Sequence, residues 1–404
     1  MRIKIHRGQN QIGGNIIEVS TDKTKILLDI GRELDDEKNK TLPDVAGLFD
    51  YKGFDAIFIS HYHADHMGLA YDAYKDIPIY IGEASYKIIK ASDEYKKMDT
   101  ISPTGFLSHR LSIQIGDIRI TPFLADHSAF DSYMILVEAE GKMLLYTGDF
   151  RSNGRKPCDW LLSQLPYNVD TLICEGTTLS RENYISETET GLEKKAVEKF
   201  QSTDGPIFVL QSSMNIDRAV TMFRAAKRCD RIFLQDLYMA EITNSINGSI
   251  PNPNSFREVK TFVTRAYSKE HFRYQLFNKY GANKISKTQI AKSKFVMCVR
   301  TSMLDYLKSL SEITPFKGGI LVYSIWEGYK KQPDTIEFLK ACGEWGLSIV
   351  SLHTSGHADK DAIVRLIECV KPKNIIPVHT ENASWFLNNT KEINIMLDSD
   401  NLET

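Results

Sequence analysis

The chain has 404 residues, of which 42% are hydrophobic and 25% charged, a composition typical of a globular protein whose length favours two or more packed units over one core. No apolar run approaches the roughly 20 residues of a membrane span, and the start MRIKIHRGQN lacks the apolar core of a secretory signal, which predicts a cytoplasmic protein without a membrane partner. The six cysteines form no close pair, so a disulfide framework and a cysteine zinc knuckle are disfavoured, and any metal must bind through His and Asp.

The first 180 residues are predicted to form many short strands, with sparse helical periodicity among them. These strands span residues 2–6, 16–19, 25–29, 56–60, 79–81, 118–122, 133–139, 143–147 and 171–174. Long amphipathic helices then alternate with apolar strands, and the last part of the chain returns to a strand, a helix and a strand. The later elements are predicted at 186–201, 207–210, 216–228, 231–234, 347–353, 359–370 and 374–380. The change of pattern predicts three segments, 1–180, 181–345 and 346–404, of which the middle one is a separate α/β layer.

The strongest chemical signal is the run of four metal-ligating side chains that directly follows the predicted strand 56–60. His61, His63, Asp65 and His66 occupy four of six consecutive positions. Strand ends present side chains to functional crevices, and imidazole and carboxylate are the ligands that zinc accepts when thiolates are absent. The spacing allows His61 and His63 to reach one ion, and Asp65 and His66 to reach a second.

Four further residues at strand ends could complete two metal sites. His127 follows strand 118–122 and could add a third nitrogen to the first ion. Asp149 follows strand 143–147 and could bridge both ions, and His379 at the end of strand 374–380 could complete the second site. Asp29 ends strand 25–29, where its carboxylate could fix the tautomer of a ligand histidine.

The motif His61-x-His63-x-Asp65-His66, together with Asp29, His127 and Asp149, resembles the signature of metallo-β-lactamase-fold hydrolases. The resemblance implies a four-layer αββα sandwich with two Zn²⁺ ions at one edge, for which Mn²⁺ is an alternative. That superfamily includes lactamases, thioesterases and nucleases, so the fold alone does not decide the function.

Three later residues are similar to motifs of the β-CASP branch of nucleic-acid-processing enzymes, which includes ribonuclease J and the pre-mRNA 3′-end cleavage subunit. Glu175 matches its first acidic motif, His357 in His-Thr-Ser-Gly-His-Ala its second, and His379 its third. Residues 211–218 and 323–329 also have the appearance of this branch. The resemblance implies that the segment 181–345 is an α/β β-CASP domain inserted into the lactamase fold.

Phosphodiester cleavage supplies a chemical reason for these residues. The expected nucleophile is a hydroxide bound to both zinc ions, with Asp65 and Asp149 at the reaction centre. His357 is the candidate general acid for the leaving oxygen, and Glu175 could hold it protonated and aimed. Small polar and cationic side chains would bind the substrate phosphates. These candidates are Ser212, Ser213, Asn215, Arg218 and Ser355. An alternative for Arg218 is an ordinary salt-bridged helix residue.

The segment 257–300 combines basic and aromatic residues. It contains eleven Lys and Arg against two acids, Glu258 and Glu270, so the rest of the chain sums to −11 within a net charge of −2. The interleaved aromatic residues are Phe262, Tyr267, Phe272, Tyr274, Phe277, Tyr280 and Phe295. This combination is typical of surfaces that bind single-stranded nucleic acid. An amphipathic helical face with solvated lysines over an aromatic core is an equally good interpretation.

The expected substrate is single-stranded RNA, because His379 at the third motif resembles the RNA-acting members of the branch. A DNA nuclease, an inactive nucleic-acid-binding subunit and a small-molecule metallo-hydrolase stay open as alternatives, as do endonuclease and 5′-exonuclease modes and the oligomeric state. The chain departs from the ribonuclease J pattern at Asp359, where serine is common, which puts a 5′-monophosphate pocket in doubt. The sequence ends about 25 residues after His379, so the further C-terminal domain of ribonuclease J is not expected.

Overall fold

Two seven-stranded sheets face each other in the first of the two units into which the chain divides. The computed structural model describes residues 1–34, 41–181, 186–246, 248–264, 271–390, 392–397 and 402–403. The first unit comprises Met1–Ile89, Asp99–Ser186 and Gly356–Thr404, and the second comprises Lys90–Met98 and Glu187–Ser355. An α/β unit is therefore inserted into the first one, as the fold prediction expected. The boundaries predicted after residues 180 and 345 lie after residues 186 and 355 in the structure.

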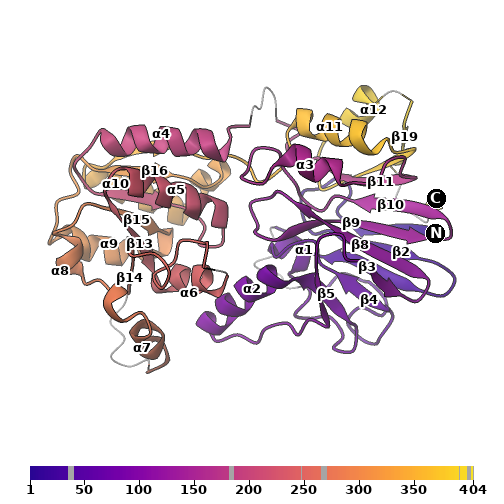
Figure 1. Cartoon of the computed structure of the whole chain (residues 1–404), viewed down its shortest axis with the longest axis horizontal. Helices are drawn as coiled ribbons and strands as arrows, with labels where there is room; N and C mark the ends of the chain where they lie inside the picture. Colours follow the sequence, from indigo (N-terminus) through magenta and orange to yellow (C-terminus); the bar gives the residue numbers. More distant parts are fainter. Residues whose placement is uncertain are drawn as a thin grey trace. The chain divides into compact units, whose positions relative to one another are not determined.

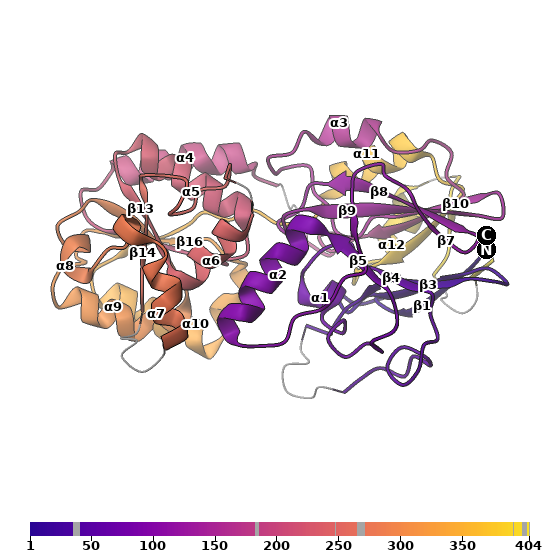
Figure 2. The same ribbon diagram turned by 60° about the horizontal axis from the view of Figure 1, so that its bottom comes forward.

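The two sheets of the first unit run in the orders β20-β1-β2-β3-β4-β5-β6 and β19-β18-β11-β10-β9-β8-β7 (Figures 1 and 2). The strands of the first sheet are β1 (Arg2–Arg7), β2 (Ile16–Ser20), β3 (Lys25–Ile30), β4 (Ala56–Phe58), β5 (Ile79–Gly82), β6 (Gly105–Leu107) and β20 (Leu402–Glu403). Those of the second are β7 (Ile113–Ile115), β8 (Ile118–Ala125), β9 (Ser132–Ala139), β10 (Lys142–Tyr146), β11 (Thr171–Glu175), β18 (Asn374–Val378) and β19 (Asn394–Ile395).

The period-2 alternation of β-strands builds the core of this unit. One face of each strand points between the sheets, where the side chains form a continuous apolar cluster. Its members include Ile3, Ile17, Leu28, Phe58, Ile120, Ile135, Leu144, Ile173 and Val378, all buried. The opposite face of the second sheet packs under helices α3 (Cys158–Ser163), α11 (Lys360–Val370) and α12 (Ser384–Asn389), which Figure 1 shows above β10 and β11. Helix α1 (Ala64–Met67) contacts β3 of the first sheet. The predicted αββα layering is confirmed.

The second unit is a parallel α/β sandwich with the strand order β14-β13-β15-β12-β16-β17. Its strands are β12 (Ile207–Leu210), β13 (Ile232–Asp236), β14 (Val259–Phe262), β15 (Phe295–Val299), β16 (Ile320–Tyr323) and β17 (Ser348–Ser351). Its helices are α4 (Glu189–Gln201), α5 (Ile216–Arg228), α6 (Leu237–Ser245), α7 (His271–Asn278), α8 (Lys287–Ile290), α9 (Leu304–Ser311) and α10 (Pro333–Glu344), with the 3₁₀ turns η1 (Gly281–Asn283), η2 (Thr301–Met303) and η3 (Glu327–Lys331). Helices α4 and α5 pack on one face of the sheet, and α9 and α10 on the other.

Two elements differ from the prediction. The sequence predicted strands with few helices in the first part of the chain, and it predicted that the strand after residue 346 belongs to the metallo-β-lactamase domain. Helix α2 (Glu83–Lys96) was not predicted, because Ser85, Ser92 and Asp93 occupy buried positions of the helix and interrupt its apolar periodicity. Strand β17 belongs to the sheet of the second unit, where it pairs with β16. Among the described residues, no helix is long and apolar enough to cross a membrane.

In the basic and aromatic segment 257–300, aromatic side chains are buried in the core and a lysine forms an ion pair at the surface. Phe262, Tyr280 and Phe295 are buried in the second unit, whereas Tyr274 is 55% exposed. Lys294 pairs with Asp204 at 2.6 Å, which neutralises one of the charges that suggested a polyanion. Tyr267 and Glu270 lie outside the described residues. The described part of this segment therefore favours the interpretation of solvated lysines over an aromatic core.

Candidate metal centre

The loop that contains His61, His63, Asp65 and His66 begins where the chain leaves the sheet after strand β4. A hydrogen bond to Asp29 fixes the start of this loop. Strand β4 ends at Phe58, two residues earlier than predicted, and the backbone N–H of Ser60 donates to Oδ1 of Asp29 at 2.6 Å instead of continuing the ladder. Helix α1 then turns Asp65 and His66 inward. Gly31 permits this turn, since a Cβ at that position would lie 1.7 Å from the carbonyl oxygen of Asp65.

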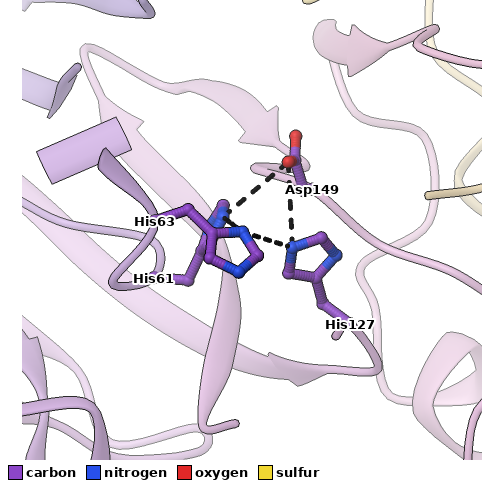
Figure 3. A group of neighbouring side chains, drawn as sticks. All are labelled: His61, His63, His127 and Asp149. Atoms are coloured by element: carbon purple, nitrogen blue, oxygen red, sulfur yellow. Dashed lines mark hydrogen bonds and ion pairs between the residues drawn. The ribbon is translucent and has the colours of Figure 1, made fainter. Parts of the chain in front are cut away.

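Four side chains form the first cluster, shown in Figure 3. His63 Nδ1 lies 3.2 Å from His61 Nε2 and 3.1 Å from His127 Nε2. Asp149 Oδ2 lies 3.7 Å from the His61 nitrogen and 3.8 Å from the His127 nitrogen. Three imidazole nitrogens and one carboxylate oxygen therefore converge on one point from the ends of β4, β8 and β10, which is a donor set that zinc accepts.

A second cluster shares Asp149 with the first. His379 Nε2 lies 3.1 Å from Asp65 Oδ2 and 3.9 Å from Asp149 Oδ1. His66 Nε2 lies 3.2 Å from Asp149 Oδ2 and 3.9 Å from Asp65 Oδ2. The structure thus brings together all seven residues predicted as metal ligands, with Asp149 close to members of both groups.

Buried polar atoms that make no hydrogen bond indicate that a cation fits these groups. Both carboxylate oxygens of Asp149 and Nε2 of His66 are buried and make no hydrogen bond. A buried carboxylate without hydrogen bonds is costly unless a cation compensates it. Burial, as the main cause, lowers the pKa of His61, His63 and His127, that of His63 to about 4, so these imidazoles are neutral at pH 7 and able to bind a metal.

The carboxylate of Asp29 orients one histidine of each cluster through hydrogen bonds. Its Oδ2 accepts from Ser60 Oγ at 2.7 Å and from Tyr146 Oη at 2.6 Å, and it pairs with His66 Nδ1 at 2.7 Å. Ser60 Oγ also lies 3.0 Å from His61 Nδ1. One carboxylate therefore orients His66 directly and His61 through the Ser60 hydroxyl, so that the opposite ring nitrogen of each faces its cluster. The structure places the predicted Asp29 beside His66, whereas Ser60 and Tyr146 were not predicted.

Replacing Asp29 with asparagine is expected to weaken metal binding about 10- to 100-fold, the usual effect of losing a partner that orients a metal-binding histidine. The carboxamide can accept fewer of the four hydrogen bonds and no longer favours the Nδ1-protonated tautomer of His66. Competition with a fluorescent zinc chelator measures the affinity. Asp170→Asn, at the far end of β11, is the matched control and should bind zinc like the unaltered chain. Equal affinity of the Asp29→Asn variant and this control would contradict the assigned role.

Glu175 and His357 form a pair beside the two ligand clusters. His357 Nδ1 lies 3.1 Å from Glu175 Oε2 and 3.4 Å from Asp149 Oδ2. Burial alone would lower the pKa of His357, but Glu175 and Asp149 more than compensate and raise it to about 9. Thr177, which was not predicted, donates from Oγ1 to Glu175 Oε2 at 2.7 Å and lies 2.8 Å from His379 Nδ1. The pair is therefore arranged to keep a proton on His357.

The predicted phosphate-binding residues all lie in the second unit, where Arg218 and Asn215 make contacts that stabilise helix α5 and its surroundings. Arg218 is fully buried, and its guanidinium binds Glu189 Oε1 at 3.0 Å and the Ser324 hydroxyl. Asn215 caps α5 by accepting from the backbone N–H of Arg218. The contacts of Arg218 therefore favour the alternative of a salt-bridged helix residue, and we do not retain it as a phosphate ligand.

Ser212, Ser213 and Ser355 follow the carboxyl ends of strands β12 and β17. Ser213 Oγ accepts from Arg300 Nη1 at 2.7 Å, and Arg300 also binds Asp236 through both of its terminal nitrogens. Arg300 and Asp236 were not predicted, because a single Arg after one strand and a single Asp ending another have no distinguishing local pattern.

Asp359, which stands where ribonuclease J sequences commonly have serine, has a local structural role. It is the N-cap of α11, and its side chain accepts from the backbone N–H of Ala362 at 2.9 Å. Aspartate and serine are both good helix N-caps. A change between these residues at this position therefore preserves the start of the helix.

A two-sheet αββα sandwich with converging His and Asp side chains at its strand ends defines a metal-dependent hydrolase. Residues 24–227, half of the chain, match the Beta-lactamase superfamily domain, and residues 347–386 match the Zn-dependent metallo-hydrolase RNA specificity domain. The chain belongs to the metallo-β-lactamase superfamily. The resemblance stated from the sequence is confirmed.

Similar proteins extend over almost the whole chain. An RNase J-like protein of Methanocaldococcus jannaschii is 27% identical over 94% of this chain and 92% of its own length. Ribonuclease J of Sinorhizobium meliloti is 20% identical over 85% of this chain, and the match covers 60% of the length of that relative. A crystal structure of a protein of unknown function from Enterococcus faecalis V583 has a TM-score of 0.81 at 19% identity and covers 99% of both chains. The last likeness shows the fold.

Proposed function

We propose that this protein is a zinc-dependent ribonuclease that hydrolyses phosphodiester bonds in single-stranded RNA. The observation that supports it most is the His357 and Glu175 pair beside two adjoining ligand clusters, because a proton donor next to a metal centre is what phosphodiester cleavage requires. The relatives named RNase J-like protein and ribonuclease J, and the match to an RNA specificity domain, support RNA as the substrate.

The first cluster and the second cluster would each hold one zinc ion, with Asp149 as the shared ligand. Bound zinc supplies a water whose pKa is lowered to about 7 and positive charge for the phosphate oxygens. The chain itself orients the ligands through Asp29 and keeps His61, His63 and His127 neutral. His357 would donate a proton to the leaving oxygen through Nε2, because Nδ1 faces Glu175. Glu175 is the positioning residue that favours the protonated form.

End-labelled RNA tests the proposal. The zinc-loaded chain should cleave single-stranded RNA, lose this activity with a chelator and regain it with zinc. Parallel substrates with a 5′-phosphate, a 5′-triphosphate or a 5′-hydroxyl would distinguish internal cleavage from 5′-end degradation through the product ladder. Faster degradation of matched single-stranded DNA would replace the proposal with a DNA nuclease. Intact RNA after incubation with a chain that contains its full complement of zinc would refute a ribonuclease function.

A further inference from the structure

Two aromatic side chains are exposed directly after strand β16 in the second unit. Trp326 is 51% exposed and Tyr329 is 42% exposed. Their rings meet edge to face, with centroids 5.4 Å apart. The two residues lie at the carboxyl end of β16, which is where α/β sheets bind their ligands.

The loop that holds the pair is well ordered by its own contacts. The carbonyl oxygen of Trp326 accepts from Tyr323 Oη at 3.0 Å and from the backbone N–H of Tyr329 at 3.1 Å. The indole ring lies against Gly328, where a Cβ would come within 2.3 Å of the ring. Only glycine therefore leaves space for the indole in this position. A ring attached to an ordered backbone segment loses less conformational entropy on binding a flat ligand than one on a disordered loop.

The aromatic pair shares its edge of the sheet with the serine loop that follows β12. Strands β16 and β12 are hydrogen-bonded neighbours in parallel register, and Ser324 N–H donates to the carbonyl oxygen of Leu210 at 2.9 Å. Ser212 and Ser213 thus follow one strand, and Trp326 follows the strand beside it. Hydroxyl donors for a phosphate and a flat apolar ring for a base therefore lie along the same edge.

Positive charge adjoins the aromatic pair. Lys330 lies over the ring of Tyr323, 4.6 Å from its centroid, and pairs with Glu327 at 2.6 Å. Lys331, at the end of η3, is exposed. Glu327 neutralises Lys330, so Lys331 supplies the net positive charge of this turn, which suits a phosphate of the ligand.

We propose that Trp326 and Tyr329 form a stacking platform that binds an unpaired base of single-stranded RNA. This inference rests on the proposed function and names the part of the second unit that selects unpaired strands. Bases within a duplex are already stacked and do not offer a free face, whereas every unpaired base does. The platform accordingly favours single strands with little preference for sequence.

Binding of a labelled eight-nucleotide oligoadenylate, followed by fluorescence anisotropy, tests the platform. The zinc-loaded chain with His357→Ala is used as the reference so that the RNA stays intact. Adding Trp326→Ala is expected to raise the Kd about tenfold, within the range for loss of one base-aromatic stack, and Trp326→Phe should raise it less. Trp160→Ala is the matched control, because Trp160 is 50% exposed in the first unit. That control should change the Kd less than twofold, with all thermal midpoints unchanged.

Oligonucleotides with a single abasic site show whether a base is the ligand. At one position the abasic site should weaken binding to the reference chain about tenfold and have no further effect on the Trp326→Ala variant. Equal Kd values for Trp326→Ala and Trp160→Ala, or additive losses at every abasic position, would overturn the platform while leaving the ribonuclease proposal intact. An unaltered chain that neither binds nor cleaves RNA would refute the ribonuclease proposal, and the platform with it.

Discussion

Replacement of Asp149 with asparagine is expected to reduce RNA cleavage more than about 1000-fold, because one side chain serves both ligand clusters. Its oxygens lie 3.7 Å from His61 Nε2, 3.2 Å from His66 Nε2 and 3.9 Å from His379 Nε2. The carboxamide has nearly the same shape but lacks the charge that two cations would require. The variant should therefore fold and fail to retain the full metal complement.

Three measurements separate this effect from a folding defect. Elemental analysis should find less zinc per chain in the Asp149→Asn variant than in the unaltered protein. The increase in thermal midpoint on zinc addition should be smaller, since the stabilisation of the folded state by a ligand grows with the logarithm of its affinity. Asp170→Asn is the control carboxylate, bonded to Lys373 at 2.7 Å at the opposite end of the second sheet, and should keep its zinc and its activity. Full zinc content with normal cleavage in the Asp149→Asn variant would refute the assignment of a shared ligand.

The positions of the predicted metal ligands could be inferred from sequence because each follows an apolar strand. Strand ends at one edge of a two-sheet sandwich converge, so local patterns around His61, His127, Asp149 and His379 were enough to place them together. The groups that orient these ligands could not be inferred in this way. Tyr146 lies within a strand whose alternating pattern predicts only a core residue, yet its hydroxyl donates to Asp29. Its polar role depends on the facing sheet, which no local pattern encodes.

Composition was a weaker guide in the second unit. The basic and aromatic segment 257–300 suggested a nucleic-acid surface, but Phe262, Tyr280 and Phe295 are core residues. Arg218 resembled a phosphate ligand at the start of a helix, yet its guanidinium is buried against Glu189. In both cases the side chain types suit either role, and only burial decides between them. Outside that segment, Trp326 and Tyr329 are exposed in a loop whose short sequence gives no sign of its exposure.

His357→Ala is expected to slow RNA cleavage by about 100- to 10,000-fold without loss of zinc, the usual range for removal of a general acid. The reason is chemical: the leaving alkoxide of RNA is strongly basic and needs a proton, whereas nitrophenolate does not. The same variant should therefore hydrolyse a nitrophenyl phosphodiester at nearly the rate of the unaltered chain. Equal losses on both substrates would show that His357 holds the metal centre together and does not donate a proton.

The pH dependence of cleavage distinguishes the donor from its positioning residue. A general acid must be protonated, so the rate falls as pH rises through the pKa of His357, which Glu175 and Asp149 raise to about 9 despite its burial. Glu175→Gln removes one of these two charges and should lower that pKa, so the alkaline limb of the pH profile moves to lower pH while the rate at pH 6 changes little. In His357→Ala the alkaline limb should be absent. An unchanged limb in Glu175→Gln would mean that the carboxylate 3.1 Å from Nδ1 does not control the protonation of His357 in the working enzyme.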